Sequence, residues 1–140
     1  MTRIRLVIVG LILTLAIAAP GADASPRHPG TGDRITLVLT SDTKVNRAVS
    51  WYDSHNRLRN QTAVPLTHFD RKTEQWSGSL TFTSRVRHQR IDAVFRSSGR
   101  FAACAVWVNE VRIREIRARS TDLAVARCSW DDDARWRAIA

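Results

Sequence analysis

The chain has 140 residues, a hydrophobic fraction of 44% and a charged fraction of 25%. These values are typical of a single globular domain and exclude wholesale disorder and collagen-like repeats. Two Cys residues are too few for a disulfide-dense mini-protein or for a Cys-rich zinc or iron–sulfur site. The formal net charge of +9 predicts a salt-dependent attraction to anionic surfaces.

Residues 1–24 have the layout of a secretory signal peptide. Arg3 and Arg5 precede an apolar run over residues 6–19, and small residues stand at positions 22 and 24. A helix of these 14 apolar residues spans about 21 Å, less than the ~30 Å hydrocarbon core of a bilayer. We therefore expect removal after Ala24 and a protein that is secreted or resides in the cell envelope. The alternative is an uncleaved N-terminal membrane anchor.

The rest of the chain is organised as a linker, a series of strands and a tail. Residues 25–33 contain two Pro and two Gly, which predicts a flexible linker. From Arg34 onward apolar residues alternate with period two, the signature of β-strands. Strands are predicted at residues 34–40, 45–51, 57–64, 76–82, 91–95, 101–108, 111–119 and 123–128. Residues 67–73 are expected to be a polar connection, residues 97–99 a hairpin turn, and residues 129–140 a C-terminal tail.

Seven or eight short strands without a convincing helix predict an all-β fold. The spacing of about ten residues is typical of a single antiparallel, immunoglobulin-like β-sandwich, here over residues 34–128. Strands 101–108 and 111–119 should form a hairpin, and the last strand brings Cys128 back towards Cys104. Outside the cytosol an isolated Cys pair favours a disulfide, which would contribute about 3 kcal/mol. Two separate buried thiols are the alternative.

The segment around the two cysteines resembles a known family. Residues 104–110 (CAVWVNE) and residues 126–128 (ARC) are similar to the C-terminal half of the mycobacterial membrane protein small (MmpS-like) family. The motif-level match covers residues 101–128. The resemblance implies a small exported actinobacterial protein with a β-sandwich domain. It also implies an accessory role beside a large lipid transporter of the resistance–nodulation–division type.

No pattern for catalysis or metal binding stands out in the sequence. His68 precedes Asp70 and His88 precedes Asp92, but neither pair belongs to a motif whose spacing has a mechanical reason. Metal-ligand spacing of His or Cys is not found, and neither is a Gly-rich phosphate loop. We therefore predict a protein that is not an enzyme, with no metal, no cofactor and no nucleic-acid partner.

Arginines alternate with apolar residues in the predicted strand 111–119. The alternation slips at Glu115, and a β-bulge at this residue would keep the apolar side chains on the core face. The core face would then hold Val111, Ile113, Ile116 and Ala118, and the outer face Arg112, Arg114, Arg117 and Arg119. Because guanidinium groups match phosphate and carboxylate groups, we expect this arginine row to bind an anionic surface. A solvated outer face, or an edge strand protected by charge, is the alternative.

Five tryptophans are many for a chain of this length. Trp51, Trp76 and Trp107 lie on predicted strands, and one of them is expected in the core near the disulfide. Trp107 falls on the face opposite to Cys104, so it is either in a second layer or exposed. An exposed Trp beside arginines would suit contact with carbohydrate or lipid.

These features together predict a non-enzymatic exported protein of the cell envelope that acts in binding or as an accessory. Its partner would be an envelope transporter, an anionic lipid or a wall polymer. The alternative is a freely secreted protein that binds anionic lipid or wall polymer through the arginine-rich strand.

Overall fold

The computed structural model describes residues 28–130, which contain nine strands and no helix. The strands are β1 (Arg34–Ser41), β2 (Val45–Tyr52), β3 (Leu58–Pro65), β4 (His68–Asp70), β5 (Gln75–Thr83), β6 (Ile91–Arg96), β7 (Phe101–Val108), β8 (Val111–Arg119) and β9 (Val125–Trp130). Within this part of the chain no helix is long and apolar enough to cross a membrane. The predicted signal peptide and residues 131–140 of the predicted tail lie outside the described residues.

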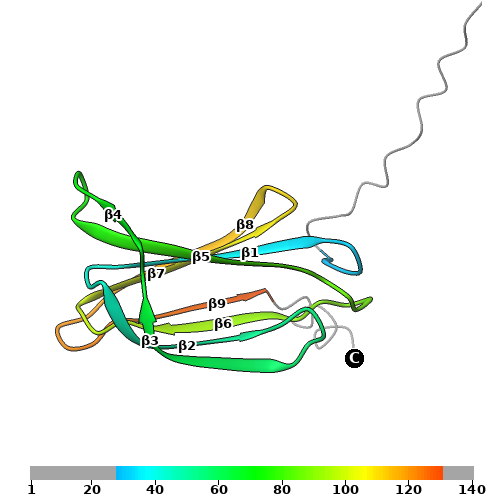
Figure 1. Cartoon of the computed structure of the whole chain (residues 1–140), viewed down its shortest axis with the longest axis horizontal. Helices are drawn as coiled ribbons and strands as arrows, with labels where there is room; N and C mark the ends of the chain where they lie inside the picture. Colours follow the sequence, from blue (N-terminus) through cyan, green and yellow to red (C-terminus); the bar gives the residue numbers. More distant parts are fainter. Residues whose placement is uncertain (1–27, 131–140) are drawn as a thin grey trace, which may run out of the picture.

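The strands form two sheets, which lie on each other as two layers (Figure 1). The five-stranded sheet A has the order β4-β5-β1-β7-β8, and the four-stranded sheet B has the order β3-β2-β6-β9. Every pair of neighbouring strands is antiparallel. The prediction of an all-β antiparallel sandwich is therefore confirmed, with nine strands where seven or eight were expected.

The core lies between the sheets because successive side chains on a strand point to opposite faces. On β1 the side chains of Ile35, Leu37 and Leu39 are buried against sheet B, whereas Thr36 and Thr40 point to the outer face. From sheet B, the core receives the buried apolar side chains of Val49, Ile91, Ala93, Phe95 and Ala126. The same alternation leaves a second, outward face on each sheet.

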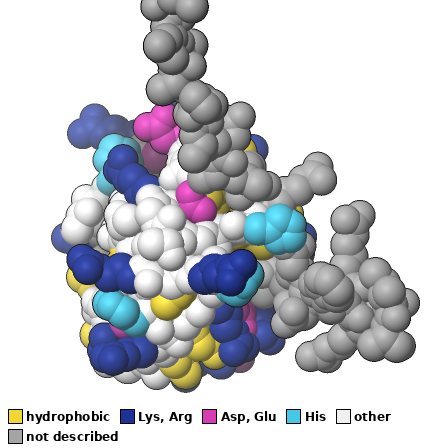
Figure 2. Space-filling model, turned by 90° about the vertical axis from the view of Figure 1, so that its right-hand side faces the viewer, with side chains coloured by type: hydrophobic (Ala, Val, Ile, Leu, Met, Phe, Trp, Pro, Cys, Tyr) yellow, Lys and Arg dark blue, Asp and Glu magenta, His cyan; other side chains and the backbone are white. Residues whose placement is uncertain are grey.

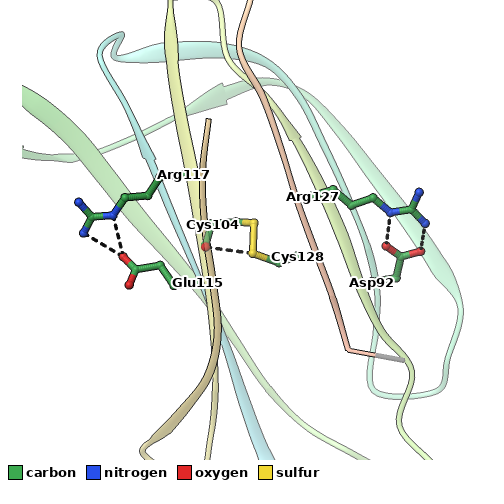
Figure 3. The surroundings of a disulfide bond; sticks show 6 residues. All are labelled: Asp92, Cys104, Glu115, Arg117, Arg127 and Cys128. Carbon is green, nitrogen blue, oxygen red and sulfur yellow. Dashed lines mark hydrogen bonds and ion pairs between the residues drawn. A yellow bond between two sulfur atoms is a disulfide. The ribbon is translucent and has the colours of Figure 1, made fainter. Parts of the chain in front are cut away.

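A disulfide joins the two sheets through the middle of the sandwich. Cys104 of β7 and Cys128 of β9 are bonded, with their Cα atoms 6.1 Å apart, as the sequence predicts (Figure 3). Both side chains are buried. The Sγ atom of Cys128 lies 2.9 Å from the carbonyl oxygen of Cys104. Since a disulfide sulfur carries no proton, this is a close polar contact and no hydrogen bond.

The ninth strand lies in the segment expected to be a polar connection. Strand β4 has three residues and pairs with the start of β5. Its Phe69 ring packs beside Trp76, with the ring centroids 4.9 Å apart. Three residues are too few to show a period-two pattern, so the sequence could not reveal this strand.

The turn at residues 97–99 joins the two sheets and does not form the predicted hairpin. It connects β6 of sheet B to β7 of sheet A. The carboxylate of Asp42 accepts hydrogen bonds from the backbone N–H groups of Arg100 (3.0 Å) and Phe101 (3.2 Å). A Cβ atom on Gly99 would overlap this carboxylate. Only glycine therefore lets the crossing chain approach Asp42 this closely.

The described part of the domain extends beyond the predicted boundaries at both ends. The backbone N–H of Gly32 donates to the carbonyl of Ser84 (2.9 Å), and that of Gln89 donates to the carbonyl of Pro29 (2.9 Å). Part of the expected linker is thus hydrogen-bonded to the sandwich. At the other end β9 continues to Trp130, two residues beyond the predicted limit of Cys128.

Candidate functional site

The bulge in β8 lies two residues earlier than the sequence pattern suggests. Trp107 of β7 is opposite Arg112, and Val106 is opposite Arg114, so Ile113 is the extra residue. The prediction of a bulge at Glu115 is therefore wrong. Both placements direct Ile116 to the core, which is why the apolar pattern could not separate them.

The shifted bulge changes the composition of the outer face of sheet A. Residues directly opposite each other in an antiparallel pair share a face. Arg114 therefore lies on the core side with Val106, at the exposed edge of the sheet. The outer row of β8, which we name the β8 row, consists of Arg112, Glu115, Arg117 and Arg119. The prediction that Arg114 joins the other three arginines is wrong, and a carboxylate takes its place.

Glu115 is shared between two arginines. Its Oε2 atom lies 2.9 Å from Nη1 of Arg112. Its Oε1 atom accepts hydrogen bonds from Nε (3.1 Å) and Nη2 (2.9 Å) of Arg117, which Figure 3 shows. One negative charge thus faces two positive charges, and Arg119 adds a third. The β8 row keeps a net charge of +2 when its three arginines and one glutamate are summed.

Aromatic rings of β7 support the two outer arginines of the row. The guanidinium carbon of Arg112 lies 5.8 Å from the ring centroid of Trp107, and that of Arg119 lies 5.0 Å from the ring of Phe101. Cation–π contacts of this kind hold the arginines across β7. The side chain of Trp107 lies on the outer face of β7, whereas that of Cys104 faces the core. Trp107 is partly exposed, as predicted. Trp51, Trp76 and Trp130 are partly buried and pack against the core.

A groove of about 530 Å³ runs over β1 and β7 on the outer face of sheet A. Its floor consists of the small and medium side chains Thr36, Val38, Thr40, Ala103 and Ala105. Its rim includes Trp107, Arg112 and Glu115, with Arg34 and Glu110 at one end. The groove exists because short side chains on the two central strands lie beside long ones on β8. Its volume is within the range of about 300–1,000 Å³ typical of small-molecule sites.

The histidine–aspartate pairs singled out in the sequence do not form a catalytic arrangement. Asp92 accepts two hydrogen bonds from Arg127, at 3.0 and 2.9 Å, and Asp70 accepts one from the backbone N–H of Lys72. Within residues 28–130, no group of three or more His, Cys, Asp or Glu side chains is arranged to hold a metal ion.

The groove itself was not predicted from the sequence. The signal that could have indicated it is the run of small residues in β7, where Ala103 and Ala105 occupy outward positions between Phe101 and Trp107. The adjacent floor of β1 is more than 60 residues away in the chain. Only the strand order of sheet A brings these segments together.

No protein-family model matches this chain, and no curated protein matches it. The resemblance of residues 101–128 to the MmpS-like family stays a prediction.

Proposed function

We propose that the protein is a non-enzymatic, exported binding protein of the cell envelope that holds an anionic amphiphile in the groove of sheet A. The amphiphile would have one hydrocarbon chain and a phosphate or carboxylate head. The observation that carries the proposal is the position of an apolar floor directly beside the guanidinium group of Arg112, with Arg34 at the end of the groove.

The floor suits a hydrocarbon chain. Val38, Ala103 and Ala105 present only carbon atoms, and Thr36 can present its methyl group, since its hydroxyl is hydrogen-bonded to that of Thr81 (3.0 Å). Each methylene removed from water contributes about 0.8 kcal/mol. A chain of several methylenes along the floor therefore supplies affinity without directional contacts.

The rim suits an anionic head. Arg112 stands at the groove with its guanidinium over Trp107, and Arg34 lies at the end of the groove. A guanidinium group can offer two parallel hydrogen bonds to a phosphate or carboxylate. The indole of Trp107 has an apolar body and a polar N–H, a combination suited to the boundary between chain and head.

The envelope location is supported by the sequence. The signal-peptide pattern of residues 1–24 favours export, and the disulfide is typical of proteins that fold outside the cytosol. The resemblance to the MmpS-like family favours a role beside a lipid transporter. The alternative is a secreted protein that binds anionic lipid or wall polymer through the β8 row alone, because Arg117 and Arg119 are exposed beyond the groove.

Binding of a fluorescent fatty acid tests the proposal. The chain of residues 25–140 contains all core residues and the disulfide, so it is the form to titrate with 11-(dansylamino)undecanoic acid. We expect saturable binding, competition by lysophosphatidylglycerol, and weaker competition by lysophosphatidylcholine.

Filling the groove separates the two candidate functions. Ala105→Phe places a ring on the floor and is expected to weaken fatty-acid binding more than tenfold, since most of the chain contact is lost. The matched control is Ala48→Phe, which adds the same ring to the outer face of sheet B, opposite Arg96. Unchanged binding by Ala105→Phe would contradict the groove and favour the β8 row alone. A lack of saturable binding by the wild type would contradict the proposal of an amphiphile in the groove.

A further inference from the structure

Three loops meet at one end of the sandwich and form a basic surface. They are residues 28–33, 53–57 and 84–90, which precede or connect β1, β2, β3, β5 and β6. Figure 2 looks onto this end, where Lys or Arg and His side chains are spread over the face with few carboxylates. We name this surface the basic end; its exposed arginines are Arg57, Arg85, Arg87 and Arg90, with Arg59 at its border.

Hydrogen bonds between the loops fix the shape of the basic end. Asn56 donates from Nδ2 to the carbonyl of His88 (2.8 Å) and accepts at Oδ1 from the backbone N–H of Arg90 (2.8 Å). The buried side chain of Gln89 donates from Nε2 to the carbonyl of Asp53 (3.0 Å). The backbone N–H of Arg85 donates to the carbonyl of Ser54 (2.9 Å). The arginines are therefore carried by a surface already ordered before any partner binds.

The carboxylates of these loops are occupied within the fold. Asp33 is buried and accepts hydrogen bonds from the backbone N–H of Gly30 (2.8 Å) and from Nδ2 of Asn109 (2.7 Å). Asp53 accepts from the backbone N–H groups of Arg57 (3.0 Å) and His55 (2.9 Å), and pairs with Nε of Arg59.

Three arginines of the basic end have no carboxylate partner in the described fold. None of the ion pairs within residues 28–130 includes Arg57, Arg85 or Arg87. The basic end thus has a surplus of positive charge on an ordered, exposed surface.

We propose that the basic end docks onto a bilayer surface that carries anionic lipid headgroups. The course of the chain supports a bilayer as the partner. The first described residue, His28, lies in this surface, and only residues 20–27 separate it from the apolar run of residues 6–19. Eight extended residues reach at most about 29 Å. A leader inserted in the membrane during export would therefore hold this end, and no other, close to the headgroups.

The position of the groove agrees with this orientation, although the proposal does not depend on the groove. Arg34 and Glu110, which lie at one end of the groove, are next to the basic end: Asn109 bonds both the backbone of Arg34 and the carboxylate of Asp33. In a docked domain, the end of the groove at Arg34 and Glu110 would thus face the headgroup layer.

Vesicle cosedimentation of the chain of residues 25–140, which lacks the leader, tests the docking. The vesicles are phosphatidylcholine alone or phosphatidylcholine mixed with phosphatidylglycerol. The wild type is expected to bind the anionic vesicles and to lose affinity as salt rises towards about 0.15 M, because the Debye length shortens. Each arginine near an anionic surface contributes about 1 kcal/mol, so Arg57→Gln with Arg85→Gln and Arg87→Gln should reduce partitioning about a hundredfold.

A variant with the same charge change at the opposite end is the matched control. Arg71→Gln, Lys72→Gln and Arg100→Gln alter the turns before β5 and β7, and this variant should bind within threefold of the wild type. Circular dichroism melting confirms that both variants are folded. The Ala105→Phe variant should also bind vesicles normally, so failure of the groove proposal is distinguishable from failure of docking.

Three outcomes would overturn the proposal. The first is equal binding to neutral and anionic vesicles. The second is an equal loss of binding in the basic-end and control variants, which would indicate attraction by net charge alone. The third is competition by soluble polyphosphate as strong, per phosphate, as that of vesicles, which would indicate a soluble polyanion as the partner.

Discussion

The outer faces of the two sheets both carry an arginine–carboxylate contact, but they balance charge differently. On sheet B, Asp92 accepts two hydrogen bonds from Arg127, which raise the pKa of that guanidinium, while Nη2 of Arg90 lies farther away, at 4.0 Å. On sheet A, Glu115 is divided between Arg112 and Arg117. Figure 3 shows these two clusters on opposite sides of the disulfide. On sheet A the carboxylate is shared by two arginines at equal distances, and one of these arginines, Arg112, lines the groove.

The difference shows that arginines on a strand are not sufficient to indicate a site. On sheet A the shared carboxylate stands beside a floor of small side chains, so an apolar group and an anion can be bound together. On sheet B, Asp92 holds Arg127 with two hydrogen bonds across β6 and β9 and faces Arg90 at 4.0 Å. The groove beside the cluster of Arg112 and Glu115 distinguishes the first face from the second.

The largest expected effect comes from removing the disulfide that joins sheet A to sheet B. Replacing Cys104 and Cys128 by Ala together should lower the free energy of unfolding by about 3 kcal/mol, because the unfolded chain is no longer closed into a loop. Urea unfolding of the variant and of the wild type measures the difference. Reduction of the wild type with dithiothreitol should give a similar loss. A change below about 1 kcal/mol would show that packing alone keeps the sheets together.

A smaller effect is expected from removing one carboxylate on each face. Glu115→Gln keeps the shape of the side chain but no longer neutralises Arg112 and Arg117 or repels an anionic head. Fatty-acid binding should become about fivefold tighter, consistent with the ~1 kcal/mol of an exposed ion pair. Asp92→Asn is the corresponding change on sheet B and should alter binding less than twofold. Weaker binding by Glu115→Gln would show instead that Glu115 positions the arginines for the ligand.

The smallest expected effect concerns the turn between β2 and β3, at the edge of sheet B. Hydrogen bonds from the backbone N–H groups of Arg57 and His55 lower the pKa of Asp53 from 3.8 to about 2. Because the pKa is lower in the folded state, the charged carboxylate stabilises the fold above about pH 4. This contribution is lost as the pH falls towards 2.

The Asp53→Asn variant measures that contribution. Its deficit in free energy of unfolding should be constant near neutral pH and shrink between about pH 4 and pH 2. Urea unfolding at a series of pH values follows the change, with Asp122→Asn as a control, whose carboxylate accepts no hydrogen bond within residues 28–130. A deficit that does not depend on pH would mean that the charge of Asp53 adds nothing to the turn.

The sequence could predict those features that depend on local alternation. Period two in β1 follows directly from burial of one face, and the almost wholly apolar sequence of β7 is typical of a strand covered on both faces. The hairpin of β7 and β8 follows from a two-residue turn. The disulfide could be predicted because an exported chain with two cysteines has only one possible pairing.

The candidate site depends on information that is not local. Ile116 and Ala118 face the core whether the bulge is at Ile113 or at Glu115, so apolar periodicity cannot decide between Arg114 and Glu115 for the outer row. That choice is made by the pairing with β7. The groove needs β1 beside β7, a long-range contact that composition and spacing do not encode.

The crossing at Gly99 limits which substitutions the chain can accept during evolution. Any side chain at this position would displace Asp42, and the N–H groups of Arg100 and Phe101 would lose their acceptor. Strand β7 begins at that point, and it supplies two of the five floor residues of the groove and one cysteine of the disulfide. Positions 42 and 99 should therefore be inherited as a unit in any descendant that keeps the groove, while the arginines of the rim are free to diverge with the ligand.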